Sequence, residues 1–125
     1  MKSPVTEICD LNSELPPDAP DAPQWLVDAL QVPREEGWVT SEGCEVHYFR
    51  WGDPANPPLL LMHGFLAHAR CMAFIAPFLA EQYHVVAYDL SGMGDSGVRS
   101  SYPDAIRAQE VVDVARETGL FDHAI

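Results

Sequence analysis

The sequence predicts an α/β fold in which an antiparallel hairpin leads into parallel strands with helices beside them. Residues 38–51 alternate between apolar and polar side chains around a turn, as a half-buried hairpin does. Residues 58–64 and 84–90 are short continuous apolar runs, typical of strands buried on both faces. Helical patterns follow these runs at 71–83 and 102–120. A hairpin followed by strand, helix, strand and helix indicates a sheet with a parallel portion.

Residues 1–36 are predicted to be an extension that precedes a domain formed by residues 37–125. Residues 1–23 are rich in proline and acidic residues and have too few large apolar side chains for a core. PQWLVDALQVP, at 23–33, is typical of one or two turns of amphipathic helix with Pro23 in the first turn. We expect this helix to dock on the domain; binding of a partner is the alternative. Its apolar stripe contains Trp25, Leu26, Ala29 and Leu30.

The remaining elements follow in chain order. The hairpin turns at Ser41–Gly43 and is rich in β-branched and aromatic residues, and the run PLLLMHG that follows it ends at a glycine. In CMAFIAPFLAEQY, large side chains recur at helical spacing, and Pro77 is tolerated only if regular hydrogen bonding begins late. The expected face is Cys71, Phe74, Ile75, Phe78, Leu79 and Gln82. The last helix has proline near its start, Asp104 in its first turn and Gly119 just past its end.

Composition limits the classes of partner. The chain has 19 acidic and 7 basic residues and a formal net charge of −12. Such a surface repels phosphate backbones and anionic lipid, so we expect neither nucleic-acid nor membrane binding. Cys9, Cys44 and Cys71 are odd in number and form no C-x-x-C pair, which predicts free thiols in a reducing compartment. With no signal-like segment in the sequence, we expect a cytoplasmic protein.

The stretch AYDLSGMGDSG, residues 87–97, matches three motifs. Read as G-x-G-x-x-G it outlines a dinucleotide-binding loop, but that loop needs a helix to open at its third glycine, and no helix can begin before about Tyr102. Read as G-D-S-G it matches trypsin-like proteases, which are all-β enzymes. Read from Asp89 it is D-x-x-G-x-G-x-S. The third interpretation is favoured because a second motif precedes it.

The second motif is His63-Gly64-Phe65 at the end of the run LLLM, one helix and one strand upstream. This succession resembles the α/β-hydrolase family, in which a strand ending in H-G-x is followed by D-x-R-G-x-G-x-S. The likeness covers residues 37–121, and it implies the N-terminal part of an α/β-hydrolase sheet. The sequence departs from the pattern at Ser91 and Met93, where many members have arginine and histidine.

The resemblance implies roles for four residues. The backbone N–H of Phe65 would donate to the oxyanion formed during attack on a carbonyl, and Gly64 would let the backbone approach the substrate. His63 would support the loop, and Phe65 and Leu66 would line the substrate pocket. We also expect the side chains of Asp89 and Ser96 to hold their loop through hydrogen bonds to the backbone.

The sequence does not contain the nucleophile that such chemistry requires. No serine, cysteine or aspartate has a glycine two residues before and two residues after it, as the G-x-S-x-G elbow demands. In the family the elbow follows the next strand, which would come after TGLFDHAI. We therefore expect an incomplete domain with no triad residue, one half of the oxyanion site, and an exposed sheet edge that promotes self-association.

The favoured hypothesis is a hydrolase, carboxylesterase-like, that cleaves an ester or similar bond in a small molecule through a nucleophile, histidine and acid. Family members work without a cofactor, and the five histidines form no metal-binding pair such as H-x-x-x-H. Epoxide hydrolase or dehalogenase chemistry, with an aspartate nucleophile, is an alternative within the family. A non-catalytic α/β binding module is the alternative outside it. The reading frame beyond Ile125 discriminates among them: G-x-S-x-G, G-x-D-x-x or a stop codon.

Overall fold

A computed structural model describes residues 22–122 of the chain; the proline-rich and acidic stretch predicted at residues 1–21, and Cys9 within it, lie outside this range. The elements are α2 (Gln24–Leu30), β1 (Glu35–Ser41), β2 (Cys44–Trp51), β3 (Pro58–Met62), η2 (Ala69–Met72), α3 (Ala76–Leu79), β4 (His84–Tyr88), α4 (Asp104–Glu117) and η3 (Leu120–Asp122). None of the helices in this range is both long enough and apolar enough to cross a bilayer.

The four strands form one mixed sheet in the order β1-β2-β4-β3. β1 and β2 are the predicted antiparallel hairpin, and its turn places Glu42 and Gly43 at positive φ, 47° and 75°, where glycine carries no steric penalty. β2 pairs antiparallel with β4, and β3 pairs parallel with β4, so that Met62 lies opposite Tyr88. The predicted fold class, an antiparallel hairpin followed by parallel strands, is confirmed.

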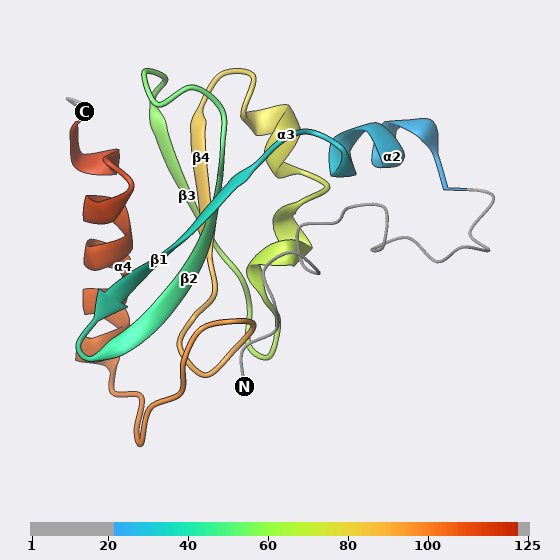
Figure 1. The fold of residues 1–125 in the computed structure, drawn as a ribbon. Helices are drawn as coiled ribbons and strands as arrows, with labels where there is room; N and C mark the ends of the chain where they lie inside the picture. The colour runs from blue at the N-terminus through green and yellow to red at the C-terminus, as the bar shows by residue number, and fades with distance from the viewer. Residues whose placement is uncertain (1–21, 123–125) are drawn as a thin grey trace.

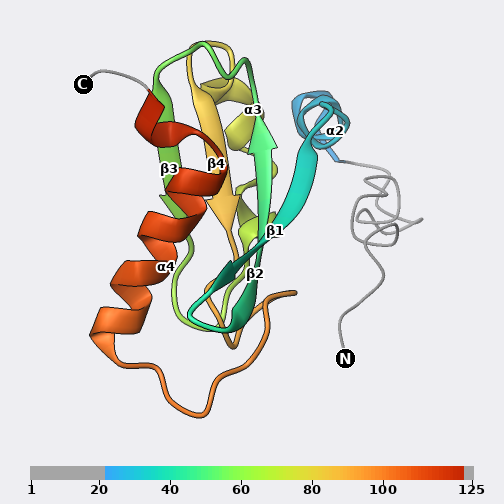
Figure 2. The ribbon, with the colours of Figure 1, turned by 60° about the vertical axis from the view of Figure 1, so that its left-hand side comes forward.

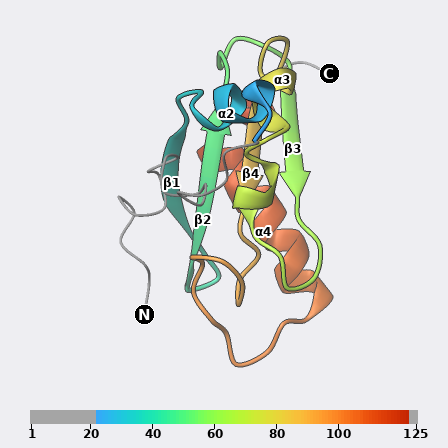
Figure 3. The ribbon, with the colours of Figure 1, turned by 90° about the vertical axis from the view of Figure 1, so that its right-hand side faces the viewer.

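Helices cover both faces of the sheet and give three layers. α4 lies against one face, and α2, η2 and α3 lie against the other (Figure 1, and from two further sides in Figures 2 and 3). Side-chain alternation along the strands supplies a separate core to each face. The core under α4 contains Val46, Tyr48, Val86, Tyr88, Val114, Ala115 and Leu120. The core under α2 and α3 contains Leu30, Phe49, Trp51, Ala69, Ala73, Ala76, Val85 and Ala87.

The predicted start and end of α4 are confirmed. Pro103 immediately precedes the helix and Asp104 lies in its first turn, where a carboxylate interacts favourably with the helix dipole. At the other end Thr118 caps the helix, and Gly119 follows with a φ of 75°. The N–H of Gly119 donates to the carbonyl of Arg116 at 3.2 Å and satisfies a carbonyl of the last turn.

The expectation of one helix over 71–83 is wrong. The segment forms a 3-10 turn, η2, and a single α-helical turn, α3, in which Pro77 is the second residue. Proline lacks an N–H and would clash with the carbonyl four residues earlier, so no continuous helix passes through it. The expected face is also wrong, because the small side chains of the segment are buried while Phe74, Ile75 and Phe78 are exposed.

The expectation that the 58–64 run is a strand buried on both faces is wrong as well. The first four residues of β3 are half-buried, and Met62 is exposed. The reason is its place in the sheet, since β4 is its one strand partner among the described residues. β4 lies between two strands and all five of its residues are buried, as predicted. The continuous apolar run therefore identifies the strand but not its position.

The helix predicted at 23–33 is α2, with Pro23 at its N-cap. Ala29 and Leu30 are buried, and Leu30 shares a core with Phe49. Trp25, expected in the same stripe, is half exposed; its ring lies 6.2 Å from that of Phe78. Part of the predicted stripe therefore packs on the sheet.

The free edge of β3 generates a prediction. We expect the 125-residue chain to self-associate with increasing concentration, because an edge strand with apolar side chains accepts a strand from another copy. Met62→Lys adds a charge at an exposed edge position and should raise the apparent dissociation constant about tenfold, equivalent to about 1.4 kcal/mol. Sedimentation velocity over a concentration series measures this, with Met62→Leu as the apolar control. A wild-type chain that stays monomeric throughout would contradict the prediction.

Candidate functional site

Both motifs found in the sequence lie at the end of the sheet where the parallel strands β3 and β4 finish. We call this end the carboxyl edge. β3 and β4 are parallel, so their carboxyl ends meet there, and the segments that follow them, 63–68 and 89–97, are neighbours. A hydrogen bond joins them, since the N–H of Leu90 donates to Nε2 of His63 at 3.0 Å. Ligand sites of open α/β sheets form at this edge, which makes it the candidate site.

His63 links the two segments. Its side chain is buried, with Nε2 accepting from Leu90 and Nδ1 lying 2.7 Å from the carbonyl oxygen of Gly64. Because Leu90 offers a donor and Gly64 an acceptor, the ring must be neutral with its proton on Nδ1. His63 thus fixes the start of the H-G-F segment relative to the strand end of β4. A role as catalytic base would require breaking one of these two bonds.

The three residues after His63 are exposed. Phe65 and Leu66 are 83% and 77% exposed, and Leu66 has a φ of 61°. A Cβ added to Gly64 would meet nothing within 4 Å, so the space beside this backbone is open. The carbonyl of Gly64 accepts from the N–H of Ala67 at 3.1 Å, but the N–H of Phe65 donates to no residue in the described range. The N–H of Phe65 therefore lies beside open space and has no acceptor in the described range.

The loop at 89–97 is held by Asp89 and Ser96, as the sequence predicts. Asp89 accepts from the backbone N–H of Ala69 at 2.7 Å and from that of Asp95 at 3.1 Å. Ser96 Oγ donates to the carbonyl of Asp89 at 2.6 Å and accepts from the N–H of His47 at 2.8 Å. Gly94 has a φ of 52°, and a side chain there would overlap the carboxylate of Asp89.

His47, at the centre of this arrangement, was not predicted as a site residue. Its side chain is fully buried, with Nδ1 2.8 Å from an oxygen of Asp89 and Nε2 2.7 Å from an oxygen of Glu36. A neutral imidazole has one N–H and can donate to one carboxylate, whereas the imidazolium donates to both. The geometry therefore requires protonated His47 whenever both carboxylates are ionised.

The pKa values of this group shift in complementary directions. Burial disfavours charge on His47, but the hydrogen bonds and charges of Asp89 and Glu36 outweigh it and raise the pKa of His47 above 6.5. Burial would raise the pKa of Asp89, but hydrogen bonds from His47, Ala69 and Asp95 outweigh it and lower that pKa below 3.8. Both shifts favour the charged pair, an imidazolium at His47 and a carboxylate at Asp89.

His47, Asp89 and Asp95 are the described side chains whose ligand atoms gather closely enough for a metal ion, within 4.8 Å of one another. Each already has protein partners. His47 is engaged at both ring nitrogens, Asp89 accepts from two backbone N–H groups, and Asp95 pairs with Arg70 at 2.8 Å. A cation would have to displace the proton of His47 and these bonds. The donor set therefore fits a hydrogen-bonded cluster better than a metal centre.

Ser91, where the family pattern has arginine, contacts a second buried carboxylate. Glu110 of α4 is fully buried and accepts from the N–H of Ser91 at 3.2 Å and from its hydroxyl. Arg99 and Arg107 supply the positive charge, with nitrogens 3.0 Å and 3.4 Å from Glu110 oxygens. These residues hold the loop against α4, a role of Glu110 that the helical pattern at 102–120 does not indicate.

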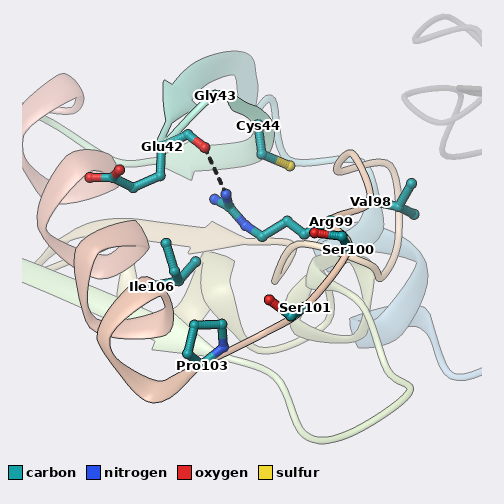
Figure 4. Close-up of a pocket in the computed structure, with 9 residues that line it drawn as sticks. All are labelled: Glu42, Gly43, Cys44, Val98, Arg99, Ser100, Ser101, Pro103 and Ile106. Atoms are coloured by element: carbon teal, nitrogen blue, oxygen red, sulfur yellow. Dashed lines mark hydrogen bonds between the residues drawn. The ribbon is translucent and has the colours of Figure 1, made fainter.

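Arg99 also closes one wall of a cavity of about 360 Å³ at the same edge (Figure 4). Its guanidinium donates to the carbonyls of Glu42 at 2.9 Å and Ser41 at 2.7 Å, so it is tied to the β1–β2 turn. The lining residues are Glu42, Gly43, Cys44, Val98, Arg99, Ser100, Ser101, Pro103 and Ile106. Phe65 and Leu66 are not among them. The predicted contact of these two side chains with substrate therefore stays a prediction.

The buried cluster generates a pH prediction. The stabilisation from His47, whose pKa is raised on folding, is complete below pH 6.5 and is lost as pH rises through its folded pKa. That from Asp89, whose pKa is lowered, is present above pH 3.8 and is lost as pH falls through its folded pKa. We expect the free energy of unfolding to be greatest between pH 3.8 and pH 6.5, where both stabilising contributions are present.

Denaturant titrations at a protein concentration below that of self-association, repeated from pH 4 to 9, measure the effect. His47→Gln should lower the free energy of unfolding by about 3 kcal/mol near pH 6, because it leaves buried carboxylates without their charge partner. The same variant should remove most of the decline at alkaline pH. Parallel pH profiles for wild type and variant would show that His47 does not carry that decline.

Comparisons with known proteins agree with this arrangement. The profile described as "Alpha/beta hydrolase family" matches residues 59–123, more than half of the chain. The chain is 34% identical over 84 residues to epoxide hydrolase 3 of Xenopus tropicalis, covering 65% of this chain and 23% of that protein. It is 44% identical over 50 residues to a fluoroacetate dehalogenase of a Burkholderia species, covering 40% of this chain and 16% of that protein.

The solved structures agree as well. A bacterial membrane phospholipase A, a virulence factor, superposes with a TM-score of 0.63 and 39% identity over 69% of this chain and 28% of that one. The chain spans from 12% to 26% of the length of the curated relatives it matches. The matched region contains both the H-G-F segment and the loop at 89–97. The chain therefore belongs to the alpha/beta hydrolase family.

Proposed function

We propose that this chain carries the backbone donor that stabilises an oxyanion in a hydrolase, and that the hydrolase cleaves an ester or similar bond in a small molecule. The observation that carries the proposal is the N–H of Phe65, which donates to no residue in the described range beside open space at the carboxyl edge of β3. The family to which the chain belongs supports it.

The chemistry follows from the position of this donor. Attack of a nucleophile on a carbonyl carbon moves charge to the oxygen, and a backbone N–H already oriented toward that oxygen lowers the barrier without reorganising. The segment is oriented because His63 fixes one end of it. Gly64 leaves the approach open, since its backbone has no side chain to obstruct a substrate.

We propose that the nucleophile, base and acid of the reaction come from a longer protein that contains this chain. No residue of the chain occupies a G-x-S-x-G elbow. The chain covers only about a quarter or less of its curated relatives, so the activity of a longer protein is part of the proposal. No step of the proposed reaction calls for a cofactor.

Opening of an epoxide or cleavage of a carbon–halogen bond is the second candidate. The observation that favours it is the similarity to epoxide hydrolase 3 and to fluoroacetate dehalogenase. An aspartate at the elbow position of the complete reading frame would support this candidate, and a serine there would support ester cleavage. Assays of the complete product on p-nitrophenyl acetate, styrene oxide and fluoroacetate separate the two.

The donor role of Phe65 is tested by a pair of variants in the complete reading frame that contains the chain. Phe65→Pro removes the N–H and should lower kcat by about 10²-fold, because one oxyanion donor contributes about 10²–10³ to kcat. Phe65→Ala keeps the N–H and loses only the ring, so it should change KM more than kcat. If both variants keep the wild-type kcat, the proposal fails.

The 125-residue chain alone should show no triad-dependent turnover. Covalent acyl transfer needs a nucleophile activated by a neighbouring base. The sequence has no nucleophile in a G-x-S-x-G elbow. Hydrolysis of p-nitrophenyl acetate by the purified chain should match that of the chain unfolded in urea, after correction for the buffer. Turnover that requires the folded chain would contradict this expectation.

A further inference from the structure

The segment from His63 to Ala69, which contains the H-G-F motif, is attached to the neighbouring loop at both of its ends. At the start, His63 accepts from the N–H of Leu90 and contacts the carbonyl of Gly64. At the end, the N–H of Ala69 donates to Oδ1 of Asp89 at 2.7 Å. The placement of the Phe65 N–H between these points therefore depends on the side-chain position of Asp89 as well as on His63.

The position of Asp89 depends in turn on His47. Its Oδ2 lies 2.8 Å from Nδ1 of His47 and accepts from the N–H of Asp95 at 3.1 Å. The other nitrogen of His47 is bound to Glu36 of β1, on the far side of the hairpin. A series of contacts thus connects Glu36 of β1, through His47 of β2 and Asp89, to the N–H of Ala69.

Acidic groups near His47 favour its charged form, and aromatic rings pack against its imidazole. The acidic groups that face it are Glu36, Asp89 and Asp95, and Asp95 is paired with Arg70. The rings of Trp38 and Phe49 lie 4.7 Å and 4.6 Å from its own ring. The guanidinium of Arg34 lies over the ring of Phe49, 4.2 Å from the ring centre.

We propose that protonated His47 is a positioning residue that sets the geometry of the oxyanion segment by holding Asp89 against the N–H of Ala69. This inference extends the proposed role of Phe65, and the effect that it predicts on catalysis rests on that role. When His47 loses its proton, it can donate to only one of its two carboxylates. A neutral ring that donates to Glu36 leaves Asp89 without this donor, so the side chain of Asp89 moves and its hydrogen bond from Ala69 is weakened.

Two variants of the 125-residue chain separate the contacts of His47. The amide of asparagine lies near the position of Nδ1, so His47→Asn can keep a donor toward Asp89 without a charge. The amide of glutamine lies near the position of Nε2, so His47→Gln can keep a donor toward Glu36. Glu36→Gln is the milder third variant, since it preserves volume and leaves the contact between His47 and Asp89 in place.

Hydrogen exchange of single amides, measured by NMR as protection factors, reads the result without any catalysis. Beyond any loss that it shares with the reference amide, Ala69 should lose about tenfold in protection in His47→Gln, and less in His47→Asn and Glu36→Gln. Val86 of the central strand β4 is the reference amide. In wild type the protection of Ala69 should fall relative to Val86 as pH rises through the titration of His47.

The proposal is overturned if Ala69 keeps its protection in His47→Gln, or if Ala69 and Val86 lose it equally in all three variants. Equal loss would mean that His47 stabilises the sheet as a whole. In the complete reading frame, His47→Gln should lower kcat with little change in KM. Loss of Ala69 protection with unchanged kcat would uphold the positioning of the segment and reject the role of Phe65 on which the predicted effect on catalysis rests.

Discussion

The structure depends on one buried charge arrangement: an imidazolium, His47, held between two carboxylates. Glu36, His47 and Asp89 come from three neighbouring strands or strand ends, so their hydrogen bonds cross the sheet at its carboxyl edge. Removing one member would leave a buried charge without a partner, which lowers the free energy of unfolding strongly. This holds even though an intact buried ion pair is often no more stable than an apolar core. The requirement that all three be present fixes the register of the hairpin relative to β4, and through Asp89 it fixes the loop beside it.

The same edge explains why the two sequence motifs act together. Parallel strands end side by side, so the segments after β3 and β4 meet although about 25 residues separate them in the chain. His63 and Asp89 then join the segments at two points, and Gly64 and Phe65, which lie between these points, are exposed. Small side chains beneath, at Ala69, Ala73 and Ala76, let the following turns lie close on the sheet. The fold thus holds an exposed backbone segment in place with buried side chains.

Much of the fold could be predicted because its signals are local. The alternation in the hairpin, the run HVVAY and the residues that begin and end α4 each identify an element without reference to the others. The edge position of β3 could not be read from its apolar run, because burial depends on which strands lie beside it. The site was predicted in part: the contact between His47 and Glu36 is one that the hairpin register implies, since Trp38 lies opposite His47 and Glu36 is its diagonal neighbour on that face. The partnership with Asp89 required the pairing of β2 with β4, which no local pattern specifies.

Membership of the alpha/beta hydrolase family and the geometry of this edge support one account, in which a charged histidine determines where a backbone donor lies. The most direct measurement is the protonation of His47 itself, read from the nitrogen-15 shifts of both ring nitrogens in the 125-residue chain at pH 7. The account predicts that both nitrogens carry protons and that the ring titrates above 6.5. A ring nitrogen with a free lone pair at pH 7 would contradict it.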